Sequence, residues 1–589
     1  MAAVCRVALV VAALGVQYSG QEIMFIADRL PLQGNKDHAD VPWPLPARWR
    51  SNTSFPLLHE TLSITSNVPG CDVIDNAAKR YRGIVGSLGK AAEPQQGGIG
   101  HVMIFVENAT CEKFPHLKMD ESYELTVFPS NVTINSRSAW GALRGLETFS
   151  QLVYEKGGMA YVKEWNIEDS PRFAHRGFMM DTARHFLPLK IIKLHLEAMA
   201  WSKLNVFHWH IVDAQSFPFV SRRFPELSDK GAFSPRHVYT PQDVAEVIEF
   251  ARLRGIRVIP EFDTPGHAHS WGKGRPELLT PCWKDGRPGT ADYGNHSEYE
   301  NFDPTKETTF EFLGEFMAEV ADVFPDQFLH VGMDEAHYMC WQSSPNITEF
   351  MIQKDFGPEG YSLLEGYYVS RAIDIISKTG KTLMLWQDPL DNGVVVNVSN
   401  IIQVWKDKDG RTAATHWEEY ANNLTARGHN VVVSSCYYLN YISYGQDWRT
   451  YYRCDPHNFN GTQEQNNRIL GGEACMWAEY VDGTNFLQRA WPRAAAVAER
   501  LWSPRDVTSD VDTAAFRLDV HRCRLLRRGV PAQPILPGFC GDYDFGLQSE
   551  ITAKTTTSSS DNNNMASVNF FSQSQAVILI VLYTLWYIS

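Results

Sequence analysis

The 589-residue chain has no excess of positive charge and no apolar run long enough for a transmembrane helix. Lys and Arg number 54 against 68 Asp and Glu, which gives a formal net charge of −14. Nucleic acids and anionic membrane surfaces bind a basic face, so this balance argues against both as partners. The two terminal apolar stretches, residues 7–16 and 576–589, are shorter than the about 20 residues that a spanning helix needs.

The first of these stretches predicts a secretory signal peptide. One positive charge precedes it, and the small and polar residues "QYSG" follow it. We expect the signal peptide to cover residues 1–20, with cleavage near Gly20. The mature protein is then expected in the secretory pathway, where disulfides form.

The cysteines are consistent with that compartment. Removal of Cys5 leaves nine, an odd number, so at least one thiol is unpaired. Connectivity cannot be deduced from sequence alone. The spacing nevertheless favours four local pairs, Cys71–Cys111, Cys282–Cys340, Cys436–Cys454 and Cys523–Cys540. Cys475, in the apolar stretch "GGEACMW", is then expected to be free and buried.

Glycosylation signals also fit a lumenal or extracellular protein. N-x-[ST] acceptor sequences occur at Asn52, Asn108, Asn131, Asn295, Asn346, Asn397, Asn423 and Asn460. We expect glycans at some of these positions.

The C-terminal residues 542–589 change composition to a polar stalk (542–575) and an apolar tail (576–589). Small residues, a polar spacer and a terminal apolar tail are typical of a GPI-attachment signal, here with attachment near residues 564–567. A lipid-anchored protein at the cell surface is therefore expected. A short tail anchor or a disordered end is the alternative.

Between the signal peptide and the stalk, the patterning divides the chain into two domains. Residues 21–168 combine alternating strands, such as "YELTVFP" and "NVTINS", with a helical stretch opened by Ser138, and predict an α+β domain. Residues 169–541 alternate strand and helix. The strand candidates are "RGFMMD", "LNVFHWHI", "IRVIPEFD", "QFLHVGMD", "TLMLWQD", "IIQVWK", "NVVVSSCYY" and "RILGGEACMW". Helical stretches are expected between them, for example over 189–203, 241–254, 306–323, 361–379 and 412–427. Eight strands, each followed by a helix, predict a (β/α)8 TIM barrel.

In such a barrel the active site lies at the C-terminal ends of the strands. The side chains found there are acids, aromatics and an Arg–His pair. In strand order they are Arg184, Asp213, His267, Asp334 with Glu335, Trp386, Trp405, Tyr438, and Trp477 with Glu479. An aromatic cup that contains acids suits a sugar, because an indole face stacks on C–H groups.

Long motifs in this order resemble family 20 glycoside hydrolases, the β-N-acetylhexosaminidases. They include "DTARHFLP", "NVFHWHIVDAQSFP", "EFDTPGHAHSWGKG", "FPDQFLHVGMDE" and "GGEACMWAEYVD". The similarity is greatest to animal lysosomal-type members. It implies hydrolysis of terminal β-linked N-acetylglucosamine or N-acetylgalactosamine with retention, without a cofactor or metal. It also implies a homodimer joined through the barrels, in the lysosome or at the cell surface.

The resemblance also implies a role for each rim residue. Family members let the substrate's acetamido oxygen attack the anomeric carbon, which makes a protein nucleophile unnecessary. Glu335 would then be general acid and base, with a pKa raised by a neighbouring anion and indole walls. Asp334 and Tyr438 would hold the acetamide. The remaining residues would form the cup (Trp386, Trp405, Trp477), bind hydroxyls (Arg184, Glu479, Asn440) and tune Glu335 as a relay (Asp213, His267).

The chain departs from the family pattern in places. Met333 stands where Gly is common, which we expect to alter only packing, and Ala214 stands where relatives often have Asp. Asn440 replaces a common Asp and resembles the subunit type that accepts negatively charged sugars. The Arg that follows in that subunit is Tyr441 here, which argues against sulfated substrates.

The sequence leaves two rival functions. His208 and His210 in "HWH" share one strand face, as in barrel metal hydrolases. No further His–Asp ligand set is expected on later strands, and the pair His267 and His269 is weak, so packed histidines are favoured. A surface lectin or adhesion protein without turnover is the other rival, and a pure binder does not need the acid Glu335. The natural glycan is not predicted by the sequence.

Overall fold

The computed structural model describes residues 24–25, 40–88, 98–156, 158–289, 300–410 and 412–540. The expected signal peptide, polar stalk and apolar tail lie outside these ranges. Met1–Pro537 belong to one structural unit, and a second begins at Gly538. In the part of the chain that is described, no helix is both long and apolar enough to cross a membrane.

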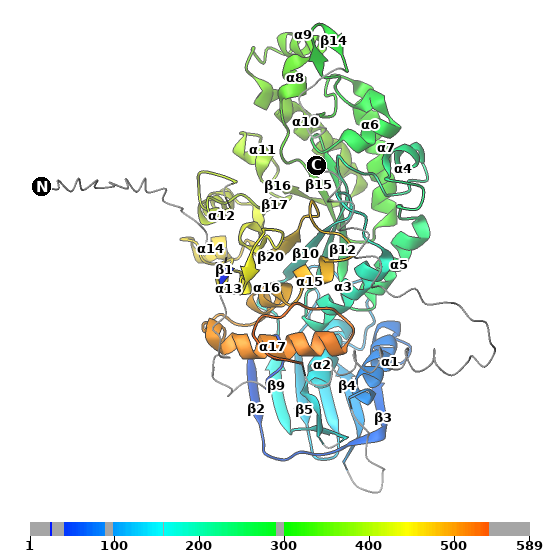
Figure 1. Ribbon diagram of the computed structural model, residues 1–589, viewed down its shortest axis with the longest axis vertical. Coiled ribbons are helices and arrows are strands. Elements are labelled where there is room, and N and C mark those ends of the chain that lie inside the picture. The colour runs from blue at the N-terminus through cyan, green and yellow to red at the C-terminus, as the bar shows by residue number, and fades with distance from the viewer. Residues whose placement is uncertain are drawn as a thin grey trace, which may run out of the picture. The chain divides into compact units, whose positions relative to one another are not determined.

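The N-terminal domain is a mixed six-stranded sheet in the order β2-β9-β5-β6-β4-β3, with helices α1 (Asp72–Gly86) and α2 (Ala139–Leu152) on it (Figure 1). Its strands are β2 (Arg48–Ser51), β3 (Leu58–Ser66), β4 (Ile99–Val106), β5 (Tyr123–Val127), β6 (Val132–Ser136) and β9 (Trp165–Asp169). As expected, Ser138 caps α2, and its hydroxyl accepts the N–H groups of Trp140 and Gly141. All of α2 is buried, because the sheet lies on one side of it and the barrel on the other.

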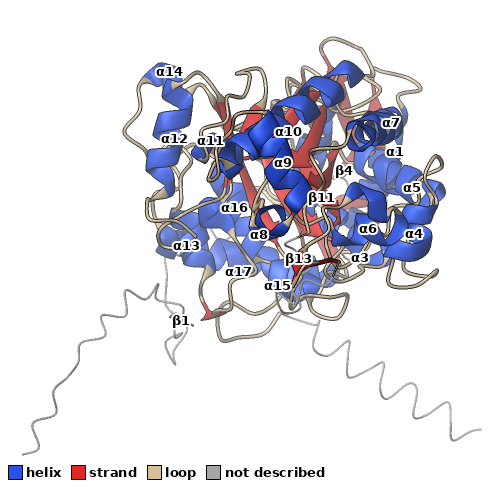
Figure 2. Ribbon diagram, turned by 90° about the horizontal axis from the view of Figure 1, so that it is seen from above, coloured by secondary structure: helices blue, strands red, loops and turns tan. Residues whose placement is uncertain are grey.

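Eight parallel strands then close into the predicted barrel. They are β10 (His175–Asp181), β11 (Val206–Val212), β12 (Arg257–Thr264), β15 (Phe328–Gly332), β16 (Thr382–Trp386), β17 (Ile401–Val404), β18 (Asn430–Val433) and β20 (Ile469–Met476). Figure 2 shows these strands surrounded by helices. The residues of β10, β11 and β12 are all buried, as expected for parallel strands covered on both faces.

The helices between the strands are of unequal length. The longer ones are α3 (Leu189–Trp201), α5 (Pro241–Arg252), α7 (Glu307–Val323), α10 (Tyr361–Ile376), α12 (Trp417–Ala426), α16 (Arg493–Trp502) and α17 (Val511–Arg527). Shorter ones are α4 (Glu226–Gly231), α6 (His269–Gly274), α8 (Met339–Ser343), α9 (Pro345–Gln353), α11 (Asp388–Asp391), α13 (Trp448–Arg453), α14 (Gln463–Asn466) and α15 (Phe486–Ala490). Small pairs of strands complete the set: β1 (Met24–Phe25) with β19 (Tyr444–Gly445), β7 (Val153–Lys156) with β8 (Met159–Val162), and β13 (Trp283–Lys284) with β14 (Arg287–Pro288).

Two helix predictions need correction. The fifth crossover contains only the four-residue α11, because "DPLDNG" places a proline at its start and Gly393, at φ +86°, just after its end. The helix expected over 412–427 begins at Trp417. Asp407 holds the residues before it, since its side chain accepts the N–H of Trp417 and its carbonyl accepts that of Thr412.

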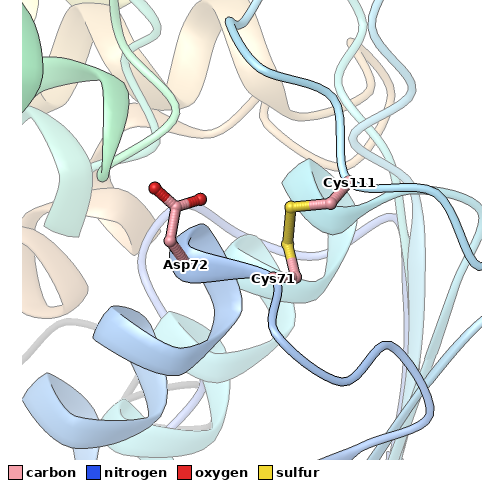
Figure 3. Close-up of side chains that lie close together, drawn as sticks. All are labelled: Cys71, Asp72 and Cys111. Atoms are coloured by element: carbon pink, nitrogen blue, oxygen red, sulfur yellow. A yellow bond between two sulfur atoms is a disulfide. The ribbon is translucent and has the colours of Figure 1, made fainter.

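Three predicted disulfides are confirmed: Cys71–Cys111, Cys282–Cys340 and Cys436–Cys454. Figure 3 shows the first of them beside Asp72, at the start of α1. Cys523 and Cys540 are each disulfide-bonded, and their mutual pairing stays a prediction. Cys475 is buried and free, as predicted.

Buried charges join the sheet domain to the bottom of the barrel. Glu121, only 3% exposed, accepts hydrogen bonds from Arg144 on α2 at 2.8 Å and from Arg176 on β10 at 2.7 Å. The same Arg144 also donates to the carbonyl of Gly255, just before β12, at 2.8 Å. This paired network fixes the strands whose far ends carry the candidate site.

Candidate active site

The segment after β15 places Asp334 and Glu335 together. Gly332, Met333 and Glu335 all have positive φ angles, of 68°, 73° and 46°. The chain therefore leaves the regular strand, in which alternate residues would face opposite sides. The backbone N–H of Met333 donates to Asp263 at 3.1 Å, and that of Glu335 donates to Asp388 at 3.3 Å. Met333 itself is fully buried, which agrees with an effect on packing.

His267 lies at the centre of the carboxylates. Its Nε2 is 3.5 Å from Glu335 Oε2 and 3.8 Å from Asp334 Oδ2, and its Nδ1 is 3.3 Å from Asp213 Oδ1. The other oxygen of Asp213 is 2.9 Å from Arg184 Nη2. The structure thus brings together five of the six predicted charged residues, from four strand ends.

The pKa of one of these groups, Glu335, differs from the expectation. Burial would lower the pKa of His267, but the charge and hydrogen bond of Asp213 outweigh it and raise that pKa well above its usual value. This cation, 3.5 Å from Glu335 Oε2, lowers the pKa of Glu335, whose side chain is 42% exposed. The raised pKa expected for Glu335 is therefore wrong for this structure, because a cation as well as an anion faces it.

Asp334, unlike Glu335, has a raised pKa. Burial raises it to about 7, against the opposing charge of His267 and with help from neighbouring carboxylates such as Asp388. The Oδ1 atom of Asp334 is buried and has no hydrogen-bond partner among the described residues. One carboxylate oxygen is thus held at the site without a donor.

The predicted aromatic cup is present beside these acids. Trp386 and Tyr438 form one buried cluster with Met179 and Cys475, and Trp405 and Trp477 pack against it. Ring centroids lie 6.0 Å apart for Trp386 and Trp477, and 6.3 Å apart for the stacked pair Trp405 and Tyr438. The sequence placed these rings at four strand ends, and closure of the barrel brings them together.

The predicted hydroxyl-binding residues lie around the cup. The Arg184 guanidinium is 4.8 Å above the Trp477 ring. Burial would lower the pKa of Arg184, but Asp213, Asp181 and, to a smaller extent, the exposed Glu479 outweigh it and raise that pKa. Asn440 has a buried side-chain oxygen without a hydrogen bond in the described part of the chain. Asn440 lies two residues after Tyr438 in the sequence, and Tyr438 belongs to the cup.

Asp388 was missed by the sequence prediction, although it ends the quoted strand "TLMLWQD". One of its oxygens accepts the Glu335 N–H at 3.3 Å and the other accepts the Trp405 indole N–H at 2.7 Å. Lys406 lies 3.0 Å away and balances its charge. Asp388 therefore ties the backbone of Glu335 to one wall of the cup.

The histidines inside the barrel bear on the metal-hydrolase alternative. His208, Glu261 and His330 offer ligand atoms within 4.8 Å of one another, and so do Asp263, His267 and Asp334, so the expectation of no further His–Asp set on later strands is wrong. His208 is not in the state of a metal ligand. His208 Nδ1 is 2.6 Å from Glu473 and its Nε2 is 3.0 Å from Glu261, and these carboxylates outweigh burial and raise its pKa to about 9. A protonated imidazole has no lone pair for a metal.

Both domains match known sequence families. Residues 173–505 match "Glycosyl hydrolase family 20, catalytic domain", and residues 37–152 match "beta-acetyl hexosaminidase like". The chain is 46% identical over 516 residues to beta-hexosaminidase subunit beta of Mus musculus, which covers 85% of this chain and 92% of that one. It is 46% identical over 480 residues to beta-hexosaminidase subunit alpha of Rattus norvegicus, covering 80% and 88%.

A solved structure agrees with the fold. The chitobiase of Flavobacterium johnsoniae superimposes with a TM-score of 0.71 at 28% identity, covering 85% of this chain and 74% of that chain. The barrel, the acids at its rim and the sequence matches agree. The chain therefore belongs to glycosyl hydrolase family 20, and it is a glycoside hydrolase of the β-N-acetylhexosaminidase type.

Proposed function

We propose that the enzyme removes terminal, non-reducing β-linked N-acetylglucosamine or N-acetylgalactosamine, with retention, by substrate-assisted catalysis. The observation that carries the proposal is the buried, unpartnered Oδ1 of Asp334 beside an aromatic cup and a second carboxyl, Glu335. A buried carboxylate oxygen without a donor is costly. An acetamide N–H of a bound sugar would supply that donor.

In the first step the acetamido oxygen attacks the anomeric carbon, and the glycosidic C–O bond breaks. Glu335 donates its proton to the leaving oxygen, and an oxazolinium ion forms on the sugar. In the second step Glu335 takes a proton from water. The water oxygen attacks the anomeric carbon, which opens the oxazolinium ring and restores the acetamido group. Two displacements on one carbon give retention. Well-oriented intramolecular attack is worth about 7–11 kcal/mol of barrier, which makes a protein nucleophile unnecessary.

The proton for the first step is held between His267 and Glu335. Their side chains are 3.5 Å apart, and the structure favours the charged pair. A sugar that fills the cup excludes water from Glu335, and a less polar environment favours the neutral pair. Substrate binding thus prepares the acid.

The other rim residues orient the sugar. Asp334 accepts the acetamide N–H and stabilises the positive charge of the intermediate, and the Tyr438 hydroxyl donates to the acetamide oxygen. Trp386, Trp405 and Trp477 enclose the ring. Arg184, Glu479 and Asn440 bind hydroxyls, for which charge-assisted hydrogen bonds are suited. Asp213 and His267 adjust the proton affinity of Glu335.

A chromogenic N-acetylglucosaminide tests the proposal, beside the matched glycoside with a 2-hydroxyl in place of the acetamido group. We expect turnover of the first and at least a thousandfold slower turnover of the second, since about 7–11 kcal/mol depends on the acetamide. Equal rates would contradict substrate assistance. Binding without turnover of either would favour the adhesion alternative, against which the intact acid Glu335 argues.

We also propose how the enzyme is processed and displayed. The signal peptide, the disulfides and the acceptor sites support a glycoprotein of the secretory pathway. Six acceptor asparagines are exposed: Asn52, Asn108, Asn346, Asn397, Asn423 and Asn460; Asn131 is half-buried and Asn295 lies outside the described residues. The C-terminal pattern supports a GPI anchor at the cell surface, and release by a phosphatidylinositol-specific lipase tests it. Without the anchor a lysosomal location is the alternative. A homodimer, implied by the family resemblance, is tested by light scattering.

A further inference from the structure

The interior of the barrel contains a buried carboxylate, Glu261 on β12, that the mechanism has not used. Its Oε2 is 2.5 Å from His210 Nδ1 and 3.0 Å from His208 Nε2. Its Oε1 accepts the indole N–H of Trp386 at 2.7 Å and lies 3.1 Å from His330 Nδ1. All five side chains are at most 1% exposed. Glu261 thus contacts a wall of the cup directly.

Glu261 also connects to the general acid. His210, whose Nδ1 faces Glu261, has its Nε2 2.8 Å from Asp213 Oδ2. The second oxygen of Asp213 is 3.3 Å from His267, and His267 is 3.5 Å from Glu335. Carboxylate and imidazole therefore alternate without interruption from Glu261 to Glu335.

The geometry fixes the charge of the middle group. Both ring nitrogens of His210 face carboxylates, so both must carry protons for both contacts to be hydrogen bonds. Burial would lower the pKa of His210, but Glu261 and Asp213 outweigh it and raise that pKa to about 10. A permanent cation thus lies beside Asp213, which is itself the partner of His267.

A purely structural role explains this arrangement poorly. TIM-barrel interiors are usually filled by branched apolar side chains. Replacing a buried ion pair with well-packed apolar residues is often neutral or stabilising. In this barrel, buried charged groups instead form a continuous row that ends at Glu335.

We propose that Glu261 and His210 are positioning residues that set the protonation state of Glu335 through Asp213 and His267, while Glu261 also holds Trp386. The inference rests on the proposed function, since it concerns the proton that Glu335 donates. The inference adds Glu261 and His210 to the relay formed by Asp213 and His267.

The direction of the effect follows from the charges. Without Glu261 or His210, Asp213 loses the cation 2.8 Å away and attracts the proton of His267 more strongly. The His267–Glu335 pair then keeps its proton on His267, and a smaller fraction of Glu335 is neutral at a given pH. The ionisable groups that face His267 and Glu335 are Arg184, Asp213, Asp263, Asp334 and His337. All of these stay in place in the variants.

The test compares pH profiles of kcat/KM for Glu261→Gln, His210→Asn and the wild type. We expect the alkaline limb of both variants to move to higher pH by about half a unit or more, because the pair then loses its proton at a higher pH, and the plateau to fall because less Glu335 is neutral; half a unit corresponds to about 0.7 kcal/mol. Glu499→Gln is the matched control, because Glu499 is an equally buried carboxylate, paired with Arg517 on α17, outside the barrel interior. It should lose thermal stability and keep the wild-type limb.

Each outcome is distinguishable. Variants that fold, turn over substrate and keep the wild-type limb would overturn the inference and leave the proposed function intact. An inactive wild type would instead overturn the proposed function. If the variants do not fold, neutron diffraction of wild-type crystals near pH 7 decides: protons on both ring nitrogens of His210 support the inference, and a bare nitrogen overturns it.

Discussion

Replacing Asp334 with Asn is the most informative single change, because it keeps the shape of the side chain and one acceptor oxygen and removes the charge. The side chain of Asp334 is 9% exposed, so an effective dielectric constant of about 20 applies rather than that of water. A unit charge about 4 Å from the positive centre of the oxazolinium ion is then worth about 4 kcal/mol. We therefore expect kcat to fall by about 10³-fold.

The assay compares two leaving groups. An aryl glycoside with an acidic phenol needs little help from the general acid, so it should restore much of the rate of Glu335→Gln. It should not restore that of Asp334→Asn, whose defect concerns the charge on the sugar. Asp391→Asn is the control for the loss of one negative charge nearby, because Asp391 pairs with Lys406 and lies outside the proposed machinery.

Two results would refute the reasoning. A loss of less than about tenfold for Asp334→Asn would mean that its charge faces little developing charge, since 1.36 kcal/mol is tenfold in rate. If the activated leaving group restored the rate of both variants, Asp334 and Glu335 would have the same role.

Three further predictions follow from the described contacts. Glu335→Gln should lose about 10²–10⁴-fold in kcat on natural disaccharides while the dissociation constant for N-acetylglucosamine, measured by calorimetry, stays within a few-fold; loss of binding would contradict a purely catalytic role. Glu121→Gln leaves Arg144 and Arg176 unpaired and should lower the free energy of unfolding in urea by about 3–5 kcal/mol. Burial would raise the folded-state pKa of Glu121, but Arg176 and Arg144 outweigh it and lower that pKa. The loss of unfolding free energy in Glu121→Gln should therefore be complete above the unfolded-state pKa of about 4.3 and become smaller as the pH falls through the folded-state pKa. A loss that does not depend on pH would show that the charge of Glu121 is not its cause. With Asn440 followed by Tyr441, kcat/KM for a 6-sulfated substrate should be below that for the neutral one, and equal values would show that the site accepts the sulfate.

Much of the fold was predictable because strong local patterns mark it. The buried strands are continuous apolar runs, and turn residues separate them from amphipathic helices. The exceptions have local causes. The crossover after β16 carries a proline and a glycine that leave room only for α11, and Asp407 delays the start of α12.

The candidate site was predictable where each residue follows its own strand. Asp388 and Glu261 were missed because their roles depend on partners from other strands, such as Trp405, Trp386 and His210, that closure of the barrel brings together. The direction of the pKa shift of Glu335 was predicted wrongly for a related reason. The sequence displays the adjacent anion, and only the structure places the cationic His267 at 3.5 Å.

The central claim is that the sugar's own acetamide is the nucleophile, and stepwise fluorination of the acetyl group tests it most directly. Fluorine withdraws electrons from the carbonyl oxygen and changes its size little. Measured with one leaving group, kcat/KM should fall with each added fluorine, from N-acetyl through mono- and difluoroacetyl to trifluoroacetyl. A rate that is independent of the number of fluorines would show that a different atom attacks the anomeric carbon.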